Sequence, residues 1–233
     1  MGYDLFGSEF LLSLCQVIII NIVLSGDNAV VIALASRNLP IHQQKKAILW
    51  GSLVAIIMRV LLTLVAVYLL KIPLLQVVGG VLLIWIAVKL LVEDKDEACS
   101  YNPDGMIAAV KTIIFADLIM SLDNVVAVAG ATRGNIPLLL ISLAISIPLI
   151  MWGSNMLMNL MERFPIIVTL GAALLGYTAG EMMLSDVYVA SLLQNMPHFL
   201  HTLIPIVTTL GVVVMGRVLQ SKKRDGEREE AAT

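Results

Sequence analysis

Long uninterrupted apolar blocks dominate this chain and limit the folds that it can adopt. Each block is long enough to cross about 30 Å of hydrocarbon as a helix. None alternates polar and apolar residues as a membrane strand does, and a backbone in lipid must satisfy its own hydrogen bonds. The sequence therefore predicts an all-α membrane protein with seven transmembrane helices, near residues 10–34, 48–70, 74–92, 107–131, 137–160, 166–184 and 202–219.

Composition agrees with a lipid bilayer as the main partner. The 233 residues are 59% hydrophobic and only 14% charged, whereas soluble domains are about 45–50% apolar and about 25% charged. The net charge of −2 and the lack of a basic patch in the sequence argue against nucleic acid as a partner. Assembly into a homo-oligomer is left open by the sequence.

A polar phrase occurs twice inside these apolar blocks. The first copy runs from Asn21 to Asn28 as N-I-V-L-S-G-D-N, and the second runs from Asp117 to Asn124 as D-L-I-M-S-L-D-N, at an offset of 96 (117 − 21). A carboxylate at the centre of a bilayer costs roughly 3 kcal/mol on insertion scales, so such residues are usually functional. Two copies in the same context predict two half-sites of one internally duplicated protein.

A second match extends the duplication to three helices per half. Gly79–Lys89 aligns with Gly171–Glu181 at an offset of 92 (171 − 79). Because three is an odd number, the two halves should cross the membrane in opposite directions, which gives an inverted 3+3 repeat plus a seventh helix. The expected domains are a first repeat (1–95), a second, inverted repeat (96–185), a seventh helix with a preceding outer loop (186–220) and a disordered cytoplasmic tail (221–233).

Lysine and arginine are distributed unevenly between the two sets of loops. One set holds Arg37, Lys45, Lys46, Lys95, Lys111, Arg163 and the basic residues after the last block, whereas the other holds only Lys71 and Arg133. Because positive residues stay in the cytoplasm, we expect the N-terminus outside and the C-terminus inside a bacterial plasma membrane.

Helical spacing places the polar side chains of each phrase on one face. Asn21, Ser25 and Asn28 follow the i, i+4, i+7 pattern, as do Asp117, Ser121 and Asn124. On a regular helix, Asp27 and Asp123 lie roughly 120° away from these stripes. Either Gly26 breaks the first helix so that Asp27 also faces inward, or the two carboxylates face a different neighbour. Leu122 replaces this glycine in the second copy, where a break is less expected.

Carboxylate, amide and hydroxyl oxygens suit hard divalent cations such as Mg²⁺, Ca²⁺ and Mn²⁺. The sequence holds no Cys and His cluster with the spacing of a zinc site. Proton coupling is a second use of the same acids. The two phrases could converge on one central site, which we favour, or form a staggered path. The residues alone thus predict a transporter of a hard divalent cation that needs no cofactor.

The doubled S-x-D-N phrase, each copy followed by A-x-R, resembles the TerC family of integral membrane proteins, most closely its small bacterial branch. This resemblance covers essentially the whole chain. It implies seven helices, a place in the lysine-exporter superfamily of inverted-repeat exporters, and efflux of Mn²⁺. The residues carried over as metal-site candidates are Asp27, Asn28, Asp117, Asp123 and Asn124, beside Asn21, Ser25 and Ser121 from the same stripes.

Three residues outside the phrases carry separate expectations. Arg59 lies centrally in the second block and should pair with an acid or with backbone carbonyls. Its repeat mate Asn155 is expected to be another buried polar group. Glu181, near the outer end of the sixth block, is either a metal ligand or outer gate, or a simple interfacial acid.

Competing functions differ in class. A membrane enzyme is disfavoured because the sequence has no nucleophile–base pair or HExxH motif. Export of Ca²⁺ or another hard cation, and a non-transporting protein that senses or delivers metal, both remain alternatives. Oxyanion handling is disfavoured because the duplicated residues in the spans are acidic.

Overall fold

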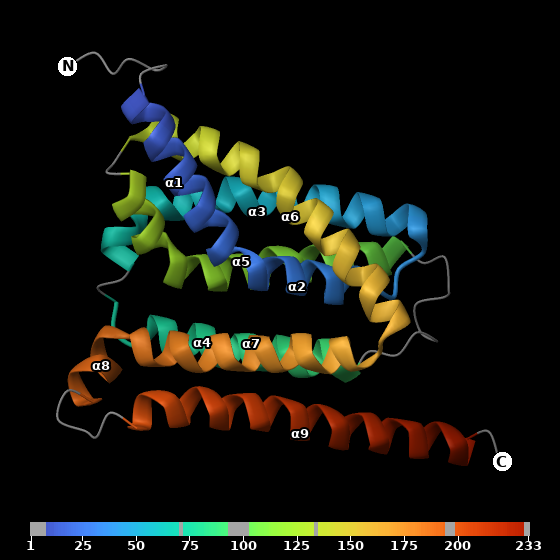
Figure 1. Cartoon of the computed structure of the whole chain (residues 1–233). Helices are drawn as coiled ribbons and strands as arrows, with labels where there is room; N and C mark the ends of the chain where they lie inside the picture. Colours follow the sequence, from blue (N-terminus) through green and yellow to red (C-terminus); the bar gives the residue numbers. More distant parts are fainter. Residues whose placement is uncertain (1–7, 70–71, 93–102, 133–134, 194–198, 231–233) are drawn as a thin grey trace.

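The computed structural model describes residues 8–69, 72–92, 103–132, 135–193 and 199–230. Every regular element in these ranges is a helix (Figure 1). The helices are α1 (Ser8–Leu24), α2 (Gly26–Ser36), α3 (Ile41–Leu69), α4 (Leu75–Val92), α5 (Pro103–Thr132), α6 (Ile136–Arg163), α7 (Ile166–Ser185), α8 (Val187–Leu193) and α9 (Phe199–Glu230).

Six of the described helices are long and apolar enough to cross a membrane, namely α3, α4, α5, α6, α7 and α9. The pair α1 and α2 gives a seventh span if the two are counted together, with a bend of 46° between them. The all-helical class is therefore confirmed, and the spans agree with the predicted blocks to within a few residues at most ends.

Successive spans run in alternating directions, and the start of α1 and the end of α9 lie at opposite ends of the bundle (Figure 1). The helices form two groups. α4, α7 and α9 pack on one another, while α1, α2, α3, α5 and α6 form the other group. The groups meet where α4 packs on α5 and α2 packs on α7. The largest apolar core lies along this junction and includes Val31, Leu34, Leu83, Met120 and Leu175.

Small residues let α7 approach α9 closely. A Cβ atom on Gly180 would lie 2.5 Å from Pro205 Cα, and one on Gly176 would lie 3.0 Å from Thr209 Cα. Both neighbours are backbone atoms, so a side chain at either position would push the helices apart. Glycines four residues apart at a close helix crossing are typical of membrane proteins.

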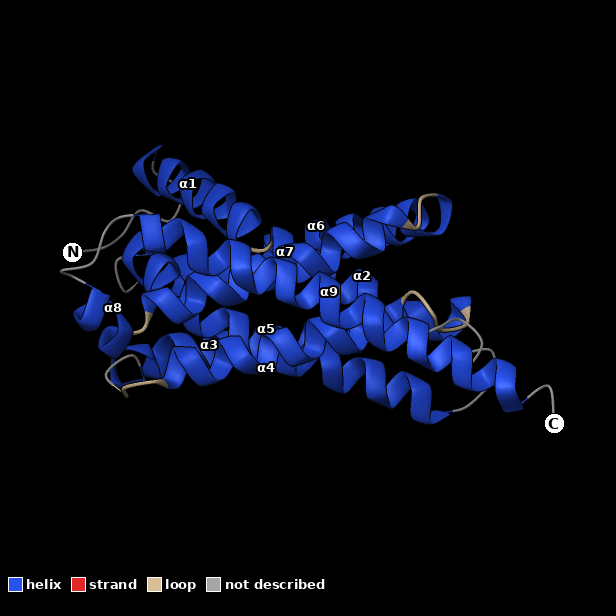
Figure 2. Cartoon of the chain, turned by 90° about the horizontal axis from the view of Figure 1, so that it is seen from below, coloured by secondary structure: helices blue, strands red, loops and turns tan. Residues whose placement is uncertain are grey.

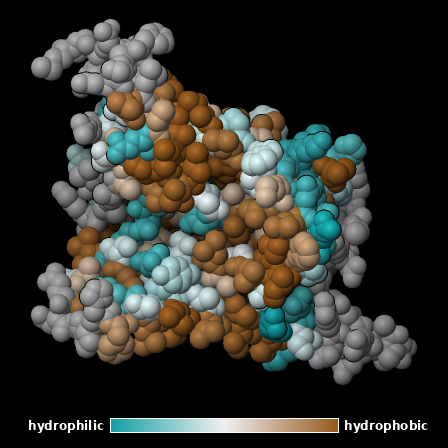
Figure 3. All heavy atoms as spheres, viewed as in Figure 1, coloured by the Kyte–Doolittle hydropathy of each residue, from teal (hydrophilic) through white to brown (hydrophobic). Residues whose placement is uncertain are grey.

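Apolar side chains also cover much of the outer surface. Figure 3 shows hydrophobic residues over much of one face, with hydrophilic residues at the end of the bundle where α6 ends and others towards the middle and the opposite end. On α3, for example, Trp50, Ile57, Leu61 and Leu64 are all exposed. A water-soluble protein rarely exposes so large an apolar surface, and these side chains are suited to contact with lipid.

Two features of the C-terminal region differ from the sequence-based expectations. α9 continues to Glu230, although we expected disorder from residue 221. Lysine, arginine and glutamate are good helix formers and can extend a helix into water. The segment before α9, which we expected to be an outer loop, also contains the short helix α8. Lys71, Lys95 and Arg133, which enter the orientation argument, lie outside the described residues.

Candidate metal centre

The first polar phrase lies at a helix break. α1 ends at Leu24 and α2 begins at Gly26, so the regular hydrogen bond between the Leu24 carbonyl and the Asn28 amide is absent. The Asn28 N–H instead donates to Asp27 Oδ1 at 2.8 Å. The Leu24 carbonyl accepts a hydrogen bond from Asn124 Nδ2 at 3.0 Å. An amide from the second phrase therefore satisfies a carbonyl freed in the first. α5 is continuous through Leu122, as its lack of glycine led us to expect.

Arg59 of α3 joins the two phrases. Its side chain donates from Nε to Ser121 Oγ at 3.0 Å and from Nη1 to Ser25 Oγ at 3.1 Å. Its Nη2 forms an ion pair with Asp117 Oδ1 at 2.5 Å, and Ser121 Oγ donates to Asp117 Oδ2 at 3.2 Å. The expectation that Arg59 pairs with an acid is confirmed.

A cavity of about 30 Å³ lies beside this network, between α2, α3, α5 and α6. By this measure a water molecule needs roughly 10–15 Å³, so the cavity can hold one or two waters or one largely dehydrated ion. Its lining residues are Asn28, Ile32, Ser52, Ala55, Ile56, Arg59, Asp117, Leu143, Ser146 and Ile150.

Two polar side chains in this lining lack hydrogen-bond partners in the described part of the chain. Both polar atoms of the Asn28 amide are unpaired, although the residue is only 3% exposed, and the Ser52 hydroxyl is also unpaired. Buried polar groups are nearly always satisfied, so an orphaned group often marks the place of a water or an ion. Asn28, Ser52 and Asp117 together supply amide, hydroxyl and carboxylate oxygens to one small space.

The remaining predicted site residues lie around this centre at different distances from it. Asn21 is buried and donates from Nδ2 to Ser142 Oγ of α6 at 3.2 Å. Asp27 is partly buried and does not line the cavity, and its Oδ1 accepts the hydrogen bond from the Asn28 amide. The helix therefore breaks at Gly26, as one of the two sequence-based alternatives required, and the Asp27 carboxylate bonds at this break instead of lining the cavity.

Asp123 follows the other alternative and faces a different neighbour. It accepts a hydrogen bond from Gln76 Nε2 of α4 at 3.2 Å. Ser185 at the end of α7 donates its hydroxyl to the Glu181 carbonyl at 3.0 Å. Glu181 is exposed on α7, where its side chain contacts Tyr177. Neither Asp123 nor Glu181 lines the cavity.

One expectation is wrong, and four polar residues around the centre were not predicted. Asn155 is exposed and donates to the Met151 carbonyl of its own helix at 2.8 Å, so it is not a buried polar group. The contributions of Gln76, Ser52, Ser142 and Ser146 were missed. A serine in an apolar span gives little signal, because its hydroxyl can bond to its own helix, as Ser146 does.

The donor types limit the metals that fit this centre. Among the described residues, no three His, Cys, Asp or Glu side chains cluster closely enough to hold a metal ion. Amide and hydroxyl oxygens would therefore have to complete any coordination shell at the cavity. Such a shell fits Mg²⁺, Ca²⁺ or Mn²⁺ and is unsuited to softer metals that prefer sulfur or imidazole.

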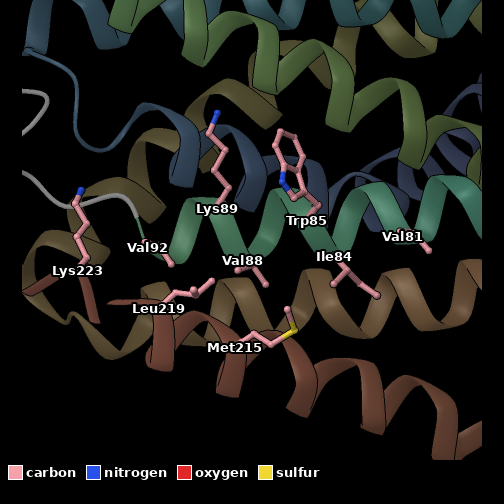
Figure 4. Close-up of a pocket in the computed structure, with 9 residues that line it drawn as sticks. All are labelled: Val81, Ile84, Trp85, Val88, Lys89, Val92, Met215, Leu219 and Lys223. Carbon is pink, nitrogen blue, oxygen red and sulfur yellow. The ribbon is translucent and has the colours of Figure 1, made fainter. Parts of the chain in front are cut away.

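A second hollow lies on the outer surface between α4 and α9 (Figure 4), with a volume of about 580 Å³. It is lined by Val81, Ile84, Trp85, Val88, Lys89, Val92, Met215, Leu219 and Lys223. Figure 4 shows Lys89 and Lys223 towards the same end of the groove. Its lining includes two lysines and no carboxylate, so this groove is unsuited to a metal cation.

Comparison with known proteins adds an independent line of evidence. A model described as the integral membrane protein TerC family matches residues 6–224. The chain is 44% identical to the uncharacterized membrane protein YjbE of Bacillus subtilis (strain 168), over 88% of this chain and 94% of that protein. It is 25% identical to the uncharacterized membrane protein YceF of the same strain, over 93% of this chain and 86% of that protein.

A more distant similarity is to the inner membrane protein YgdQ of Escherichia coli (strain K12). The two are 24% identical, over 72% of this chain and 79% of that protein. No solved structure matches the chain. The matched proteins are described as membrane proteins, in agreement with the helices described above.

Proposed function

Because this chain belongs to the integral membrane protein TerC family, we propose that it exports a divalent cation, with Mn²⁺ as the preferred cargo. It is a multi-pass membrane protein, and the proposed route passes through the cavity between α2, α3, α5 and α6. In this proposal the protein is a transporter in the bacterial plasma membrane and not an enzyme.

One observation carries the proposal, namely the unpaired Asn28 and Ser52 side chains beside the Asp117 carboxylate. All three can present oxygen to one ion in a space of about 30 Å³. Asn28 and Asp117 come from different copies of the repeated phrase, which favours one shared site over a staggered path. In this proposal Asp27, the residue before Asn28, supplies a second negative charge, and two carboxylates balance a divalent ion.

The small cavity disfavours Ca²⁺, which takes 6–8 oxygen ligands at 2.3–2.6 Å. The choice of Mn²⁺ over Mg²⁺ in this proposal comes from the family resemblance.

The pairing of helices supports an inverted repeat. α3, the second span of the first half, packs on α5, and its counterpart α6 packs on α1 and α2. α4 packs on α5, and its counterpart α7 packs on α2, while α4 and α7 pack on each other. Exchanging the two halves thus reproduces these contacts. The opposite directions of α2 and α5 in Figure 1 agree with inversion.

Substrate flux in proteoliposomes tests this function directly. Purified protein should transport Mn²⁺ faster than Mg²⁺, Ca²⁺, Zn²⁺ or Fe²⁺. Asn28→Ala should lower Mn²⁺ flux at least tenfold because it removes a donor from the cavity. Asn155→Ala is the matched control, since Asn155 is exposed and bonds only within α6. Saturable Mn²⁺ binding without flux in the wild-type protein would instead support the sensor or delivery alternative.

A further inference from the structure

Arg59 occupies an unusual position for an arginine in a membrane span. It lies near the middle of α3, is 6% exposed, and uses all three guanidinium nitrogens to contact the two repeated phrases. Ser25 and Ser121, its two hydroxyl partners, are each 1% exposed. Such a residue is costly to bury and usually has a function beyond packing.

The atoms that hold Arg59 are also the ones suited to a metal ion. The guanidinium lies on one carboxylate and two hydroxyl oxygens, and it lines the same cavity as the unpaired Asn28. A divalent cation beside Asp117 would be strongly repelled by a guanidinium on the same carboxylate, because charges interact strongly in a site of low dielectric constant. Full binding of the metal therefore requires Arg59 to leave Asp117.

Charge pairing explains why Arg59 and the metal would alternate on Asp117. The Asp117 carboxylate is buried, and either a divalent cation or the Arg59 guanidinium can compensate its charge. Without the metal and without Arg59, this charge would stay uncompensated in an apolar bundle. With Arg59 in place the carboxylate is paired, so the empty protein can change conformation at a lower cost.

We infer that Arg59 is a tethered cation that replaces the metal on Asp117, so that the empty transporter returns without carrying a second ion across the membrane. This inference rests on the proposed transport function. It assigns Arg59 to the return step of the cycle and makes export of the metal independent of proton countertransport.

Two modes of flux separate the return step from the metal-bound step. Exchange of labelled Mn²⁺ for unlabelled Mn²⁺ needs only the loaded protein, whereas net efflux also needs return of the empty protein. Arg59→Gln should bind Mn²⁺ at least tenfold more tightly, because the competing cation is gone. It should keep exchange within threefold of wild type, while the ratio of net efflux to exchange falls at least tenfold.

Arg59→Lys retains a positive charge and should give a ratio between those of Arg59→Gln and the wild type. Arg37→Gln is the matched control, because Arg37 bonds to the Leu90 carbonyl, away from the cavity. It should change both modes by the same factor. An unchanged ratio in Arg59→Gln would overturn the inference, since Arg59 would then be only a structural tie.

The wild-type protein provides a second test if Arg59→Gln cannot be purified. Net Mn²⁺ efflux should move no protons, measured with a trapped pH-sensitive dye while K⁺ and valinomycin clamp the membrane potential. A fixed ratio of protons to Mn²⁺ would overturn the tethered-cation inference and leave the transport function standing. Absence of any metal flux in the wild type would defeat the transport function and, with it, this inference.

Discussion

Asp117→Asn tests whether the centre of the bundle is organised by charge. The substitution keeps the shape of the side chain but leaves the buried Arg59 guanidinium without its counter-ion, which lies 2.5 Å away in the wild type. Removing one partner of a buried pair costs about 3–5 kcal/mol, which corresponds to roughly two to nearly four powers of ten in the unfolding equilibrium. The same change removes a negative charge from the cavity, so Mn²⁺ flux should fall below detection.

Asp123→Asn is the natural comparison, because it is the same substitution in the same helix, six positions further along the chain (123 − 117). Asp123 accepts a hydrogen bond from the neutral Gln76 amide at 3.2 Å and is only partly buried. The new amide can still accept this bond, so the loss should be at most about 1 kcal/mol. Unfolding in mixed micelles, followed by circular dichroism, measures both values, and flux should persist in Asp123→Asn.

A double-mutant cycle then isolates the ion pair itself. Arg59→Gln combined with Asp117→Asn should cost less than either single change, because the double variant leaves no buried charge unpaired. Strict additivity, to within about 0.5 kcal/mol, would show that the two residues act independently. It would refute the reasoning that the guanidinium and the carboxylate form one buried unit.

Three further predictions concern packing, the helix break and orientation. Gly180→Ala should lower the free energy of unfolding by about 1–3 kcal/mol, because its Cβ would meet the α9 backbone at 2.5 Å. Gly211→Ala on α9 places its Cβ in open space and should leave the free energy of unfolding unchanged. Asn124→Ala should cost about 1–3 kcal/mol in the same unfolding assay, because it leaves the Leu24 carbonyl unpaired; a negligible loss would mean that water replaces the amide. A single cysteine introduced as Lys222→Cys should react with an impermeant maleimide in inside-out vesicles only, and labelling of intact cells would reverse the proposed orientation.

The sequence predicted the spans well because their signal is local. An apolar block of about 20 residues has few alternatives in lipid. The break at Gly26 and the intact helix at Leu122 also follow from local chemistry, since glycine tolerates the bend and leucine favours the helix. The extension of α9 was missed because a charged, apolar-poor segment is typical of both disorder and a solvated helix.

The contents of the centre were harder to predict because they depend on contacts between distant helices. The sequence indicated that Arg59 needs a partner, and the packing of α3 on α5 makes Asp117 that partner. Asp123 belongs to the same phrase as Ser121, yet it turns towards Gln76 of α4. Ser121 and Asp123 lie two positions apart on one helix and point in different directions, so belonging to one motif did not place both at the cavity.

The bend at Ser25 also has a mechanical consequence. α1 is a 17-residue arm, about 25 Å long, whose pivot lies directly beside the centre of the bundle. Asn21 lies four residues from this pivot, at roughly 6 Å, so a tilt that displaces the free tip by 4 Å moves Asn21 by about 1 Å. That is enough to rupture its 3.2 Å contact with Ser142. Lipid or a neighbouring protein that displaces the start of α1 would therefore move Asn21 in the core without touching any residue that lines the cavity.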